Sequence, residues 1–484
     1  MRTSASHPLQ IASVSAGPGR GRIGITFCPG KTQPSSMTGG WNRDLDADVA
    51  AITDWGAAAV VTLIEPHEIE SLEVAGLGKA VAAAHMDWIH LPIPDVSVPD
   101  RKFEDAWTIA GEGLRARLRD GFDVLVHCKG GLGRAGMIAA RLLAELGTAP
   151  GEAVERVRAA RDRAIETPAQ LAHVLAISPR PPLQPPGDSD SIRDRAIGSL
   201  LGLAVGDALG TTLEFSRRDS KPALTDIVGG GPFGLEPGQW TDDTSMALAL
   251  AASLDAYPSL READLMRRFT RWHEEGDYSC TGRCFDIGIT TRQALMRWKA
   301  SGDPIAGSTD PMSAGNGSLM RLSPVAICHW RDRARLRDVA ARQSATTHAA
   351  AEAVDACILF ADMLADAIAG EPRAQVMRRR DEAYAGAISA IAAGSWRGNP
   401  RDEVRSSGYV AHCLEAALWS SGRTSNFADA VLTAANLGDD ADTTAAVAGQ
   451  LAGALYGASG IPKSWLEKLA WEPRIRSMAE ALLA

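Results

Sequence analysis

The sequence predicts two domains of different fold class: an α/β domain with a central, mainly parallel sheet, followed by an all-helical domain. Its 484 residues exceed what one compact core accommodates. Residues 178–191 hold five prolines within eight positions, which forbid a helix and favour an extended spacer. Short β-branched runs precede this segment, whereas long Ala-, Leu- and Gly-rich stretches follow it. We therefore expect domains at residues 1–177 and 192–484, joined by a linker at 178–191.

The α/β prediction depends on alternating strand and helix patterns in the first domain. Residues 57–64 (AAAVVTLI) and 123–127 (DVLVH) have the continuous apolar character of buried strands. Residues 103–118 and 136–146 have the amphipathic pattern of helices. This alternation is typical of a parallel sheet covered by helices.

The all-helical prediction depends on four long segments, at residues 195–209, 243–254, 349–369 and 443–456. In the last of these, small residues recur at every fourth position: Ala445, Gly449, Gly453 and Gly457. One face of that helix is therefore nearly bare, which allows a second helix to approach closely. We expect it to be a buried, central helix.

The composition limits which classes of binding partner and which cellular compartment we expect. A formal charge of −9 argues against a nucleic-acid partner, which usually requires a clustered basic surface. No apolar run approaches the roughly 20 residues that span a bilayer, and no secretory signal is evident, so we expect no membrane partner. Seven scattered cysteines favour a reducing compartment. The sequence thus predicts a cytoplasmic protein.

A strand–loop–helix motif carries the first set of reactive residues. Residues 124–143, VLVHCKGGLGRAGMIAARLL, begin as a strand, turn through glycines and continue as a helix. Such a loop points backbone N–H groups inward to cradle an anion, and its positive field favours a thiolate at Cys128. Arg134 adds a planar fork for two phosphoryl oxygens. The other candidate anion-binding residues are Lys129, Gly130, Gly131 and Gly133.

This HCKGGLGR segment resembles the HCxxGxxR signature of dual-specificity protein tyrosine phosphatases, especially kinase-associated phosphatases, over residues 22–175. The resemblance implies a phosphorylated substrate, a phosphocysteine intermediate at Cys128, and Asp95 as the acid that protonates the leaving oxygen. Asp100 is the alternative acid, although its position also suits a helix N-cap. His127 is expected to orient the loop. The competing interpretation of Cys128 is a small buried residue in a glycine turn.

One position departs from the phosphatase pattern. The family usually carries Ser or Thr directly after the arginine, where the hydroxyl helps the thiolate leave the phosphoenzyme, but here the residue is Ala135. Two interpretations follow: a phosphatase with slow turnover, or a domain that binds phosphate without hydrolysing it.

Two aspartate-rich segments in the second domain carry the other set of reactive residues. GQWTDDTSMALAL (residues 238–250) and NLGDDADTTAAVAG (436–449) each place Asp and Thr oxygens at the start of a predicted helix. Simple N-capping would explain one such cluster. If both helix starts converge, however, the repulsion among buried carboxylates requires bound cations. Oxygen-only ligation points to Mg²⁺ or Mn²⁺.

Five segments resemble the ADP-ribosylglycohydrolase family, which includes dinitrogenase reductase-activating glycohydrolases, over residues 193–483. In order they are GLAVGDALGTTLEF, WTDDT, AGNGSLMR, THAA and GDDADTTAA. The resemblance implies Glu214 as an active-site glutamate, and two Mg²⁺ or Mn²⁺ ions held by Thr241, Asp242, Asp243, Asp440, Asp442 and Thr443. It places Asn316, Gly317 and His348 against the substrate. Asp439 stands where the family usually has glycine.

The implied reaction is hydrolysis at the anomeric carbon of an ADP-ribosylated protein or small molecule, with Asp440 or Glu214 as the proton acceptor. Two residues have competing interpretations: His348 as a buried core histidine, and Glu214 as a surface residue. Three hypotheses follow for the whole chain: a bifunctional hydrolase, a glycohydrolase with a phosphate-binding module, or a non-enzymatic relative resembling lens crystallins. The intact aspartate clusters argue against the third.

Overall fold

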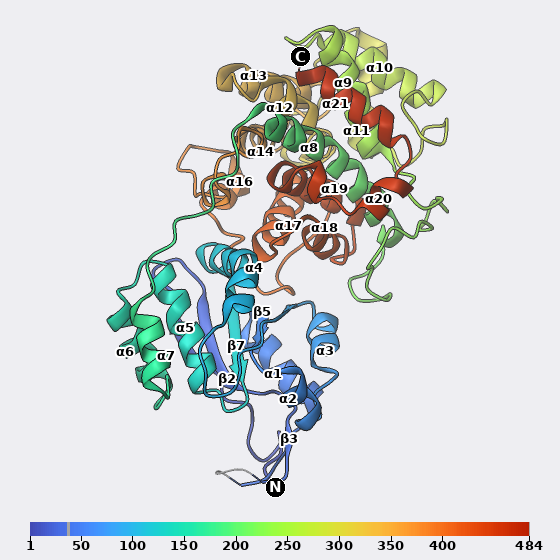
Figure 1. The fold of residues 1–484 in the computed structure, drawn as a ribbon. Coiled ribbons are helices and arrows are strands. Elements are labelled where there is room, and N and C mark those ends of the chain that lie inside the picture. The colour runs from blue at the N-terminus through green and yellow to red at the C-terminus, as the bar shows by residue number, and fades with distance from the viewer. Residues whose placement is uncertain (36–38, 484) are drawn as a thin grey trace. The chain divides into compact units, whose positions relative to one another are not determined.

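The computed structural model describes residues 1–35 and 39–483 (Figure 1). The chain divides into two compact units, which are treated separately below. Unit 1 comprises Met1–Leu183 with Gly422–Ser425, and unit 2 comprises Gln184–Ser421 with Asn426–Ala484. The first division, between Leu183 and Gln184, lies within the proline-rich segment.

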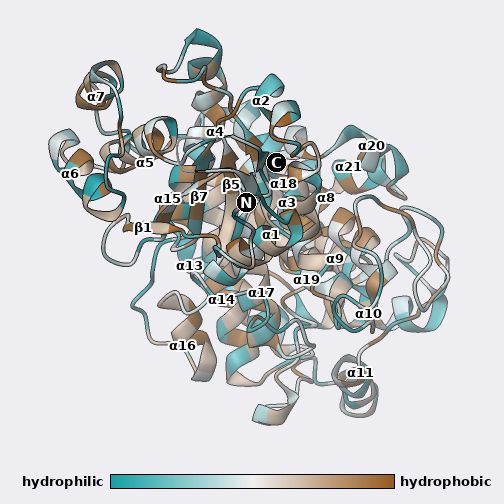
Figure 2. Cartoon of the chain, turned by 90° about the horizontal axis from the view of Figure 1, so that it is seen from below, coloured by the Kyte–Doolittle hydropathy of each residue, from teal (hydrophilic) through white to brown (hydrophobic). Residues whose placement is uncertain are grey.

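Unit 1 contains a five-stranded sheet with the order β1-β2-β7-β5-β6. Its strands are β1 (Ala12–Ser15), β2 (Arg22–Phe27), β5 (Ala57–Thr62), β6 (Asp87–His90) and β7 (Asp123–Cys128). Only β1 pairs antiparallel, so the predicted mainly parallel sheet is confirmed. The hydrophobic β5 and β7 appear brown in Figure 2. A separate short pair joins β3 (Thr32–Gln33) to β4 (Trp41–Asn42).

Helices cover both faces of this sheet (Figure 1). One core contains side chains of α4 (Arg101–Arg119), α5 (Gly133–Glu145), α6 (Pro150–Ala160) and α7 (Pro168–Leu175). The other contains side chains of α1 (Leu45–Trp55), α3 (Leu77–Ala83) and the turn after α2 (Pro66–Ser71). Helix α5 begins three residues earlier than predicted, because the glycine loop ends at Leu132 and every residue of the helix is buried.

Unit 2 is helical, as predicted; its described residues form isolated β-bridges but no named strand. Its longer helices are α8 (Ser189–Gly210), α9 (Asp242–Ala256), α10 (Glu262–Glu275), α11 (Ile289–Ser301), α13 (Arg333–Ala345), α14 (Ala351–Ala369), α17 (Val410–Arg423), α19 (Ala441–Tyr456) and α21 (Glu472–Leu483). Shorter helices are α12 (Ser323–His329), α15 (Arg373–Val376), α16 (Gly386–Ala392), α18 (Phe427–Ala435) and α20 (Lys463–Lys468).

Helices α8 and α19 pack backbone to backbone at the centre of unit 2. A Cβ added at Gly202 would lie 2.2 Å from the carbonyl oxygen of Gly449, and one at Gly206 would lie 2.1 Å from that of Ala445. The bare face of α19 is therefore buried as predicted. Its partner face on α8 repeats glycine at the same four-residue interval: Gly198, Gly202, Gly206 and Gly210. This antiparallel contact brings the C-terminal end of α8 beside the start of α19.

Helix α8 also corrects one expectation from the sequence. Together with the 3-10 turn that follows it, Ser189–Leu213 is long and apolar enough to cross a membrane by length and composition. However, 94% of its most apolar 18-residue window is buried inside the protein. The close packing of α8 against α19 explains why this helix is so apolar. The helix begins at Ser189, earlier than predicted, where Asp188 caps it by accepting a hydrogen bond from Ser191 N.

Candidate active sites

The glycine loop of unit 1 closes around the Cys128 sulfur. The backbone N–H of Gly131 donates to Cys128 Sγ at 3.2 Å. Gly131 has a φ of +69°, and a Cβ there would lie 2.5 Å from Phe27 N, so only glycine fits. The loop joins the end of β7 to the start of α5, which is the strand–loop–helix setting that the sequence predicted.

Arg134 is held beside the loop by a buried carboxylate. Its Nη1 and Nη2 donate to Glu68 at 2.6 and 2.9 Å, and Nη1 also donates to Ile93 O at 3.0 Å. Burial by itself would raise the pKa of Glu68, but the hydrogen bonds from Arg134 and from the Glu65 backbone outweigh it and lower that pKa. This bidentate pair fixes the plane of the guanidinium. Glu68 was not among the residues predicted from the sequence, because its only local role is in the capping box of α2.

The structure places the two candidate acids differently. Asp95 Oδ1 lies 2.9 Å from Arg134 Nη2, while 57% of the Asp95 side chain remains exposed. Asp100 instead caps α4 by accepting from Phe103 N at 2.8 Å, as its N-cap interpretation predicted. Of the two candidate acids, Asp95 is therefore the one that contacts Arg134.

Three further side chains support the loop. His127 is fully buried, its Nε2 lies 2.7 Å from Thr62 Oγ1, and burial lowers its pKa to about 3, so it is neutral. Lys31 Nζ donates to the carbonyl of Lys129 at 3.0 Å, and Arg161 Nε donates to that of Gly131 at 3.1 Å. The loop carbonyls thus point away from the sulfur toward cations.

In unit 2 the two aspartate-rich helix starts meet. Thr241 Oγ1 lies 3.4 Å from Asp442 Oδ2 across 201 residues of sequence, and Thr443 Oγ1 donates to Asp243 Oδ2 at 3.3 Å. Asp242, Asp243 and Asp442 are all buried. Convergence of the N-termini of α9 and α19, the arrangement on which the metal hypothesis depended, is therefore present.

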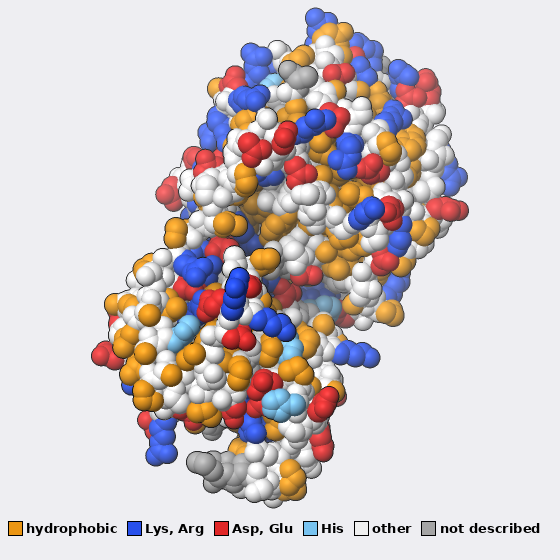
Figure 3. All heavy atoms as spheres, in the orientation of Figure 1, with side chains coloured by type: hydrophobic (Ala, Val, Ile, Leu, Met, Phe, Trp, Pro, Cys, Tyr) orange, Lys and Arg blue, Asp and Glu red, His pale blue; other side chains and the backbone are white. Residues whose placement is uncertain are grey.

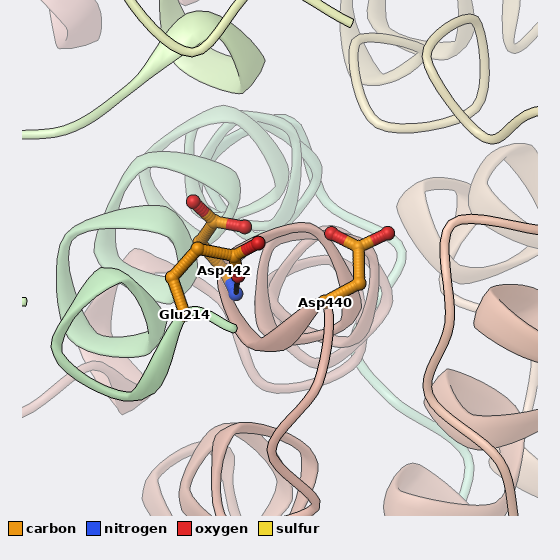
Figure 4. Close-up of side chains that lie close together, drawn as sticks. All are labelled: Glu214, Asp440 and Asp442. Atoms are coloured by element: carbon orange, nitrogen blue, oxygen red, sulfur yellow. Dashed lines mark hydrogen bonds between the residues drawn. The ribbon is translucent and has the colours of Figure 1, made fainter. Parts of the chain in front are cut away.

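Glu214 joins this cluster from the segment after α8 (Figure 4). Glu214, Asp440 and Asp442 each offer an oxygen within 4.8 Å of the others. Glu214 Oε2 accepts from Ala441 N at 2.8 Å and from Asp442 N at 3.2 Å, so it also caps α19. Burial and the neighbouring carboxylates of Asp442 and Asp440 raise the pKa of Glu214, and burial raises that of Asp442 to about 7. Glu214 is buried, which excludes its surface interpretation.

Two further carboxylates at this site were not singled out from the sequence. Asp207, on α8, accepts four hydrogen bonds: from Thr241 N and Oγ1, both at 2.9 Å, and from Thr244 N and Oγ1, at 3.0 and 2.6 Å. Asp286 lies in the loop before α11, where burial and the charges of Asp442 and Asp207 raise its pKa to about 9. Asp207 could have been recognised from the sequence, because a charged residue is unusual inside an apolar helix. No sequence pattern marks Asp286, because only the fold brings it near the other carboxylates.

The glycine-rich loop lies on the Asp440 side of the cluster. Asn316 Nδ2 donates to Asp440 Oδ2 at 2.7 Å. A Cβ at Gly317 would lie 2.7 Å from His348 Cε1, so the loop packs directly against the imidazole. His348 is buried, its Nδ1 lies 2.8 Å from Thr347 Oγ1, and burial lowers its pKa to about 3. The structure thus brings together Asn316, Gly317 and His348.

The donor set of unit 2 fits a divalent cation. It consists of carboxylate and hydroxyl oxygens, the ligands that Mg²⁺ and Mn²⁺ prefer. Among the described residues, Asp243 Oδ1 is buried without a hydrogen-bond partner. Burial and neighbouring carboxylates raise the pKa values of Asp242 and Asp243 well above the usual range. Bound cations would relieve both the unpartnered oxygen and the mutual repulsion.

Unit 2 is helical, its centre is packed through glycines, and it brings carboxylates together at two helix starts. The chain belongs to the ADP-ribosylglycohydrolase family, whose model matches residues 188–484. Residues 31–175 match the model of the Swiss Army Knife protein DSP-PTPase phosphatase domain. The chain is therefore a hydrolase with a phosphatase-type domain before its glycohydrolase domain.

Relatives and a solved structure agree with this assignment. The chain is 48% identical to ADP-ribosylarginine hydrolase Tri1 of Pseudomonas putida (strain GB-1), over 60% of this chain and 78% of that protein. It is 35% identical to ADP-ribosyl-[dinitrogen reductase] glycohydrolase of Rhodospirillum rubrum, over 61% of this chain and 97% of that protein. A structure described as an ADP-ribosylglycohydrolase-related protein complex aligns at a TM-score of 0.55 with 39% identity, covering 60% of this chain and 98% of that one.

Proposed function

We propose that the chain is a bifunctional hydrolase. Unit 2 cleaves the glycosidic bond of ADP-ribosylated arginine in the presence of two Mg²⁺ or Mn²⁺ ions, and unit 1 hydrolyses phosphomonoesters through Cys128. The observation that supports the first activity is the convergence of Thr241, Asp442 and Thr443 with Asp243 and Glu214. Similarity to ADP-ribosylarginine hydrolases supports arginine as the acceptor.

In unit 2 the residues that would hold the metal ions are Thr241, Asp242, Asp243, Asp440, Asp442 and Thr443. Bound cations would supply Lewis acidity at this site. Asn316 and Gly317 hold the ADP-ribose against the cluster, with neutral His348 behind the loop. Asp440 or Glu214 accepts the proton of the water, which adds to the anomeric carbon as the bond to the arginine nitrogen breaks.

In unit 1, Cys128 attacks the phosphorus atom while Asp95 donates a proton to the leaving oxygen. Arg134 and the N–H groups around Lys129, Gly130, Gly131 and Gly133 bind the phosphoryl oxygens. Water then releases phosphate from the cysteine and restores the thiolate. The position of Asp95, 2.9 Å from Arg134, supports its role as the acid.

A second candidate for unit 1 is a phosphate-binding module. It is favoured by one observation: the residue after Arg134 is Ala135, whose buried methyl group cannot assist departure of the thiolate. Aryl phosphate turnover by the full chain, lost in Cys128→Ser, would support the phosphatase. Tight binding of an oxyanion such as tungstate without turnover would support the module.

The glycohydrolase is tested by release of ADP-ribose from ADP-ribosylarginine by the full chain with Mg²⁺ or Mn²⁺. We expect Asp242→Ala and Asp440→Ala to abolish release, with chelation by EDTA having the same effect. Arg193→Ala, at an exposed ion pair of α8, is the control and should keep wild-type activity. Wild-type rates in either aspartate variant would contradict the proposal.

The proposed partners are an ADP-ribosylated protein or small molecule and a phosphorylated substrate, and no membrane. On the face shown in Figure 3, Lys and Arg side chains are interspersed with Asp and Glu, which supports small anions rather than a polynucleotide as ligands. All seven cysteines are free, which is consistent with the proposed cytoplasmic location.

A further inference from the structure

Three phenylalanines gather beside the carboxylate cluster of unit 2. The ring centroids of Phe215 and Phe233 lie 6.3 Å apart in an edge-to-face arrangement, and those of Phe233 and Phe285 lie 5.3 Å apart. We call these three residues the aromatic rim. They come from three separate segments: the turn after α8, the loop before α9, and the loop before α11.

The aromatic rim is joined to the site through the backbone at both ends. Phe215 directly follows Glu214, and Phe285 directly precedes Asp286. Glu214 Oε2 accepts from Asp442 N at 3.2 Å, and the Asp286 carboxyl group interacts with the Asp442 side chain, so each lies beside the first turn of α19. The rim therefore borders the Glu214 and Asp286 side of the cluster.

Phe215 combines an exposed side chain with a strained backbone conformation. Its side chain is 70% exposed, and its backbone has a φ of +57°, a region that bulky residues avoid. Reciprocal hydrogen bonds maintain this conformation: Phe215 N donates to Asp439 O, and Asp439 N donates to Ser216 O, both at 2.8 Å. An exposed ring on a strained backbone, next to Glu214 and beside a second ring, is the geometry from which we argue a ligand contact.

Different chemistry surrounds Asp440, which Figure 4 shows to one side of Glu214 and Asp442. Asn316 donates to Asp440, and Gly317 packs on His348, the residues assigned above to ADP-ribose. The aromatic rim is thus left for the group on the other side of the scissile bond. That group is a planar guanidinium in ADP-ribosylarginine. Aromatic faces attract such cations.

We infer that the aromatic rim is the acceptor-recognition surface of the glycohydrolase, where Phe215 stacks on the guanidinium of an ADP-ribosylated arginine. This inference rests on the proposed glycohydrolase function and adds the residues that select the acceptor. The rim positions the arginine side of the substrate and takes no part in proton transfer.

The test compares Phe215→Leu and Phe215→Trp in the full chain with Mg²⁺. Leucine keeps apolar volume but removes the ring, and tryptophan keeps a flat aromatic face. For ADP-ribosylarginine we expect KM to rise about three- to tenfold in Phe215→Leu and to stay within about twofold of wild type in Phe215→Trp, with kcat unchanged in both. The Kd of free ADP-ribose should be unchanged in both. Met296→Ala, at an exposed apolar residue of α11, is the matched control.

The outcomes separate this inference from the function on which it rests. A weaker Kd for ADP-ribose in Phe215→Leu would show that the rim stacks on adenine and would overturn the inference while leaving the glycohydrolase intact. An unchanged KM for ADP-ribosylarginine would do the same. A wild-type chain that binds ADP-ribose but releases none from ADP-ribosylarginine would overturn the arginine assignment and the inference together. Agmatine, a free guanidinium compound, provides a binding readout: its inhibition constant should rise about three- to tenfold in Phe215→Leu only.

Discussion

The two sites of this chain are built in opposite ways. The anion-binding loop of unit 1 occupies eight consecutive residues, from His127 to Arg134, and its one buried cation already has a counterion in Glu68. The carboxylate cluster of unit 2 contains residues as far apart in sequence as Thr241 and Asp442, which are separated by 201 positions. Among the described residues, its Asp243 Oδ1 is buried without a hydrogen-bond partner. A contiguous loop can satisfy its charges locally, whereas an assembled acidic cluster depends on packing and on a bound ion.

The contrast between the two sites requires that they act independently, and this is the prediction with the largest expected effect. Cys128→Ser should lower aryl phosphate turnover at least about 1000-fold, because the nucleophile is lost, and leave ADP-ribosylarginine hydrolysis unchanged. Asp242→Ala should do the reverse. Both activities are to be measured on the same preparations of full chain. Loss of both activities in either variant would mean that the sites are coupled.

Metal removal should destabilise only unit 2. Saturating Mg²⁺ or Mn²⁺ at about 100 times its Kd should add about 2.7 kcal/mol to the free energy of unfolding of that unit. Calorimetry should show the transition of unit 2 shifting with metal, while that of unit 1, defined by its shift with tungstate, stays in place. Asp243→Asn should remove most of the metal-dependent shift.

The pH dependence of the metal-free protein follows from the raised pKa of Asp442. Its folded-state value is about 7 against 3.8 for the free group, so the folded state holds the proton more tightly. Stability of metal-free unit 2 should therefore fall as pH rises from about 4 to about 7. Asp442→Asn, which cannot ionise, should make that profile less steep in thermal melts, and the slope that remains comes from Glu214, Asp242, Asp243 and Asp286, whose pKa values are also raised. A metal-free stability that increases over this range would contradict the prediction.

The close contact of α8 and α19 sharpens the comparison, because it aligns site residues from two helices, whereas the anion-binding loop of unit 1 is continuous in sequence. Gly202→Ala would place a methyl group 2.2 Å from Gly449 O, and we expect a loss of about 1–3 kcal/mol in the free energy of unfolding. Glycohydrolase activity should fall with it, since the contact aligns Glu214 with Asp442. Gly151→Ala, in α6 with nothing within 4 Å of the new Cβ, is the control and should not destabilise. Denaturant titration measures both.

The smallest expected effect concerns Ala135. Ala135→Ser adds a hydroxyl where phosphatases usually carry one, and we expect release of phosphate from the phosphoenzyme to accelerate about two- to tenfold. Stopped-flow kinetics should show a burst followed by slow turnover in the wild type, and a faster steady state in the variant. The same steady state in both would indicate that release of the thiolate is not limiting.

Sequence reasoning was most successful where the chemistry was local. The parallel sheet, the strand–loop–helix around Cys128 and the capping role of Asp100 each follow from a few neighbouring residues, and the structure contains all three. The aspartate-rich helix starts of α9 and α19 were also visible, because Asp and Thr favour the first turn of a helix. Their convergence was a hypothesis that needed the fold.

What only the tertiary structure decided is which groups face one another. Glu68 reads locally as a helix-capping residue, yet it anchors Arg134 across 66 positions of sequence. Asp207 reads as a misplaced charge in an apolar helix, yet it fixes the start of α9 through four hydrogen bonds. The small residues at every fourth position of α19 predicted a closely packed helix, but they did not identify that helix as α8. Local patterns specify secondary structure and capping through interactions a few residues apart, but long-range neighbours arise only when the buried faces pack.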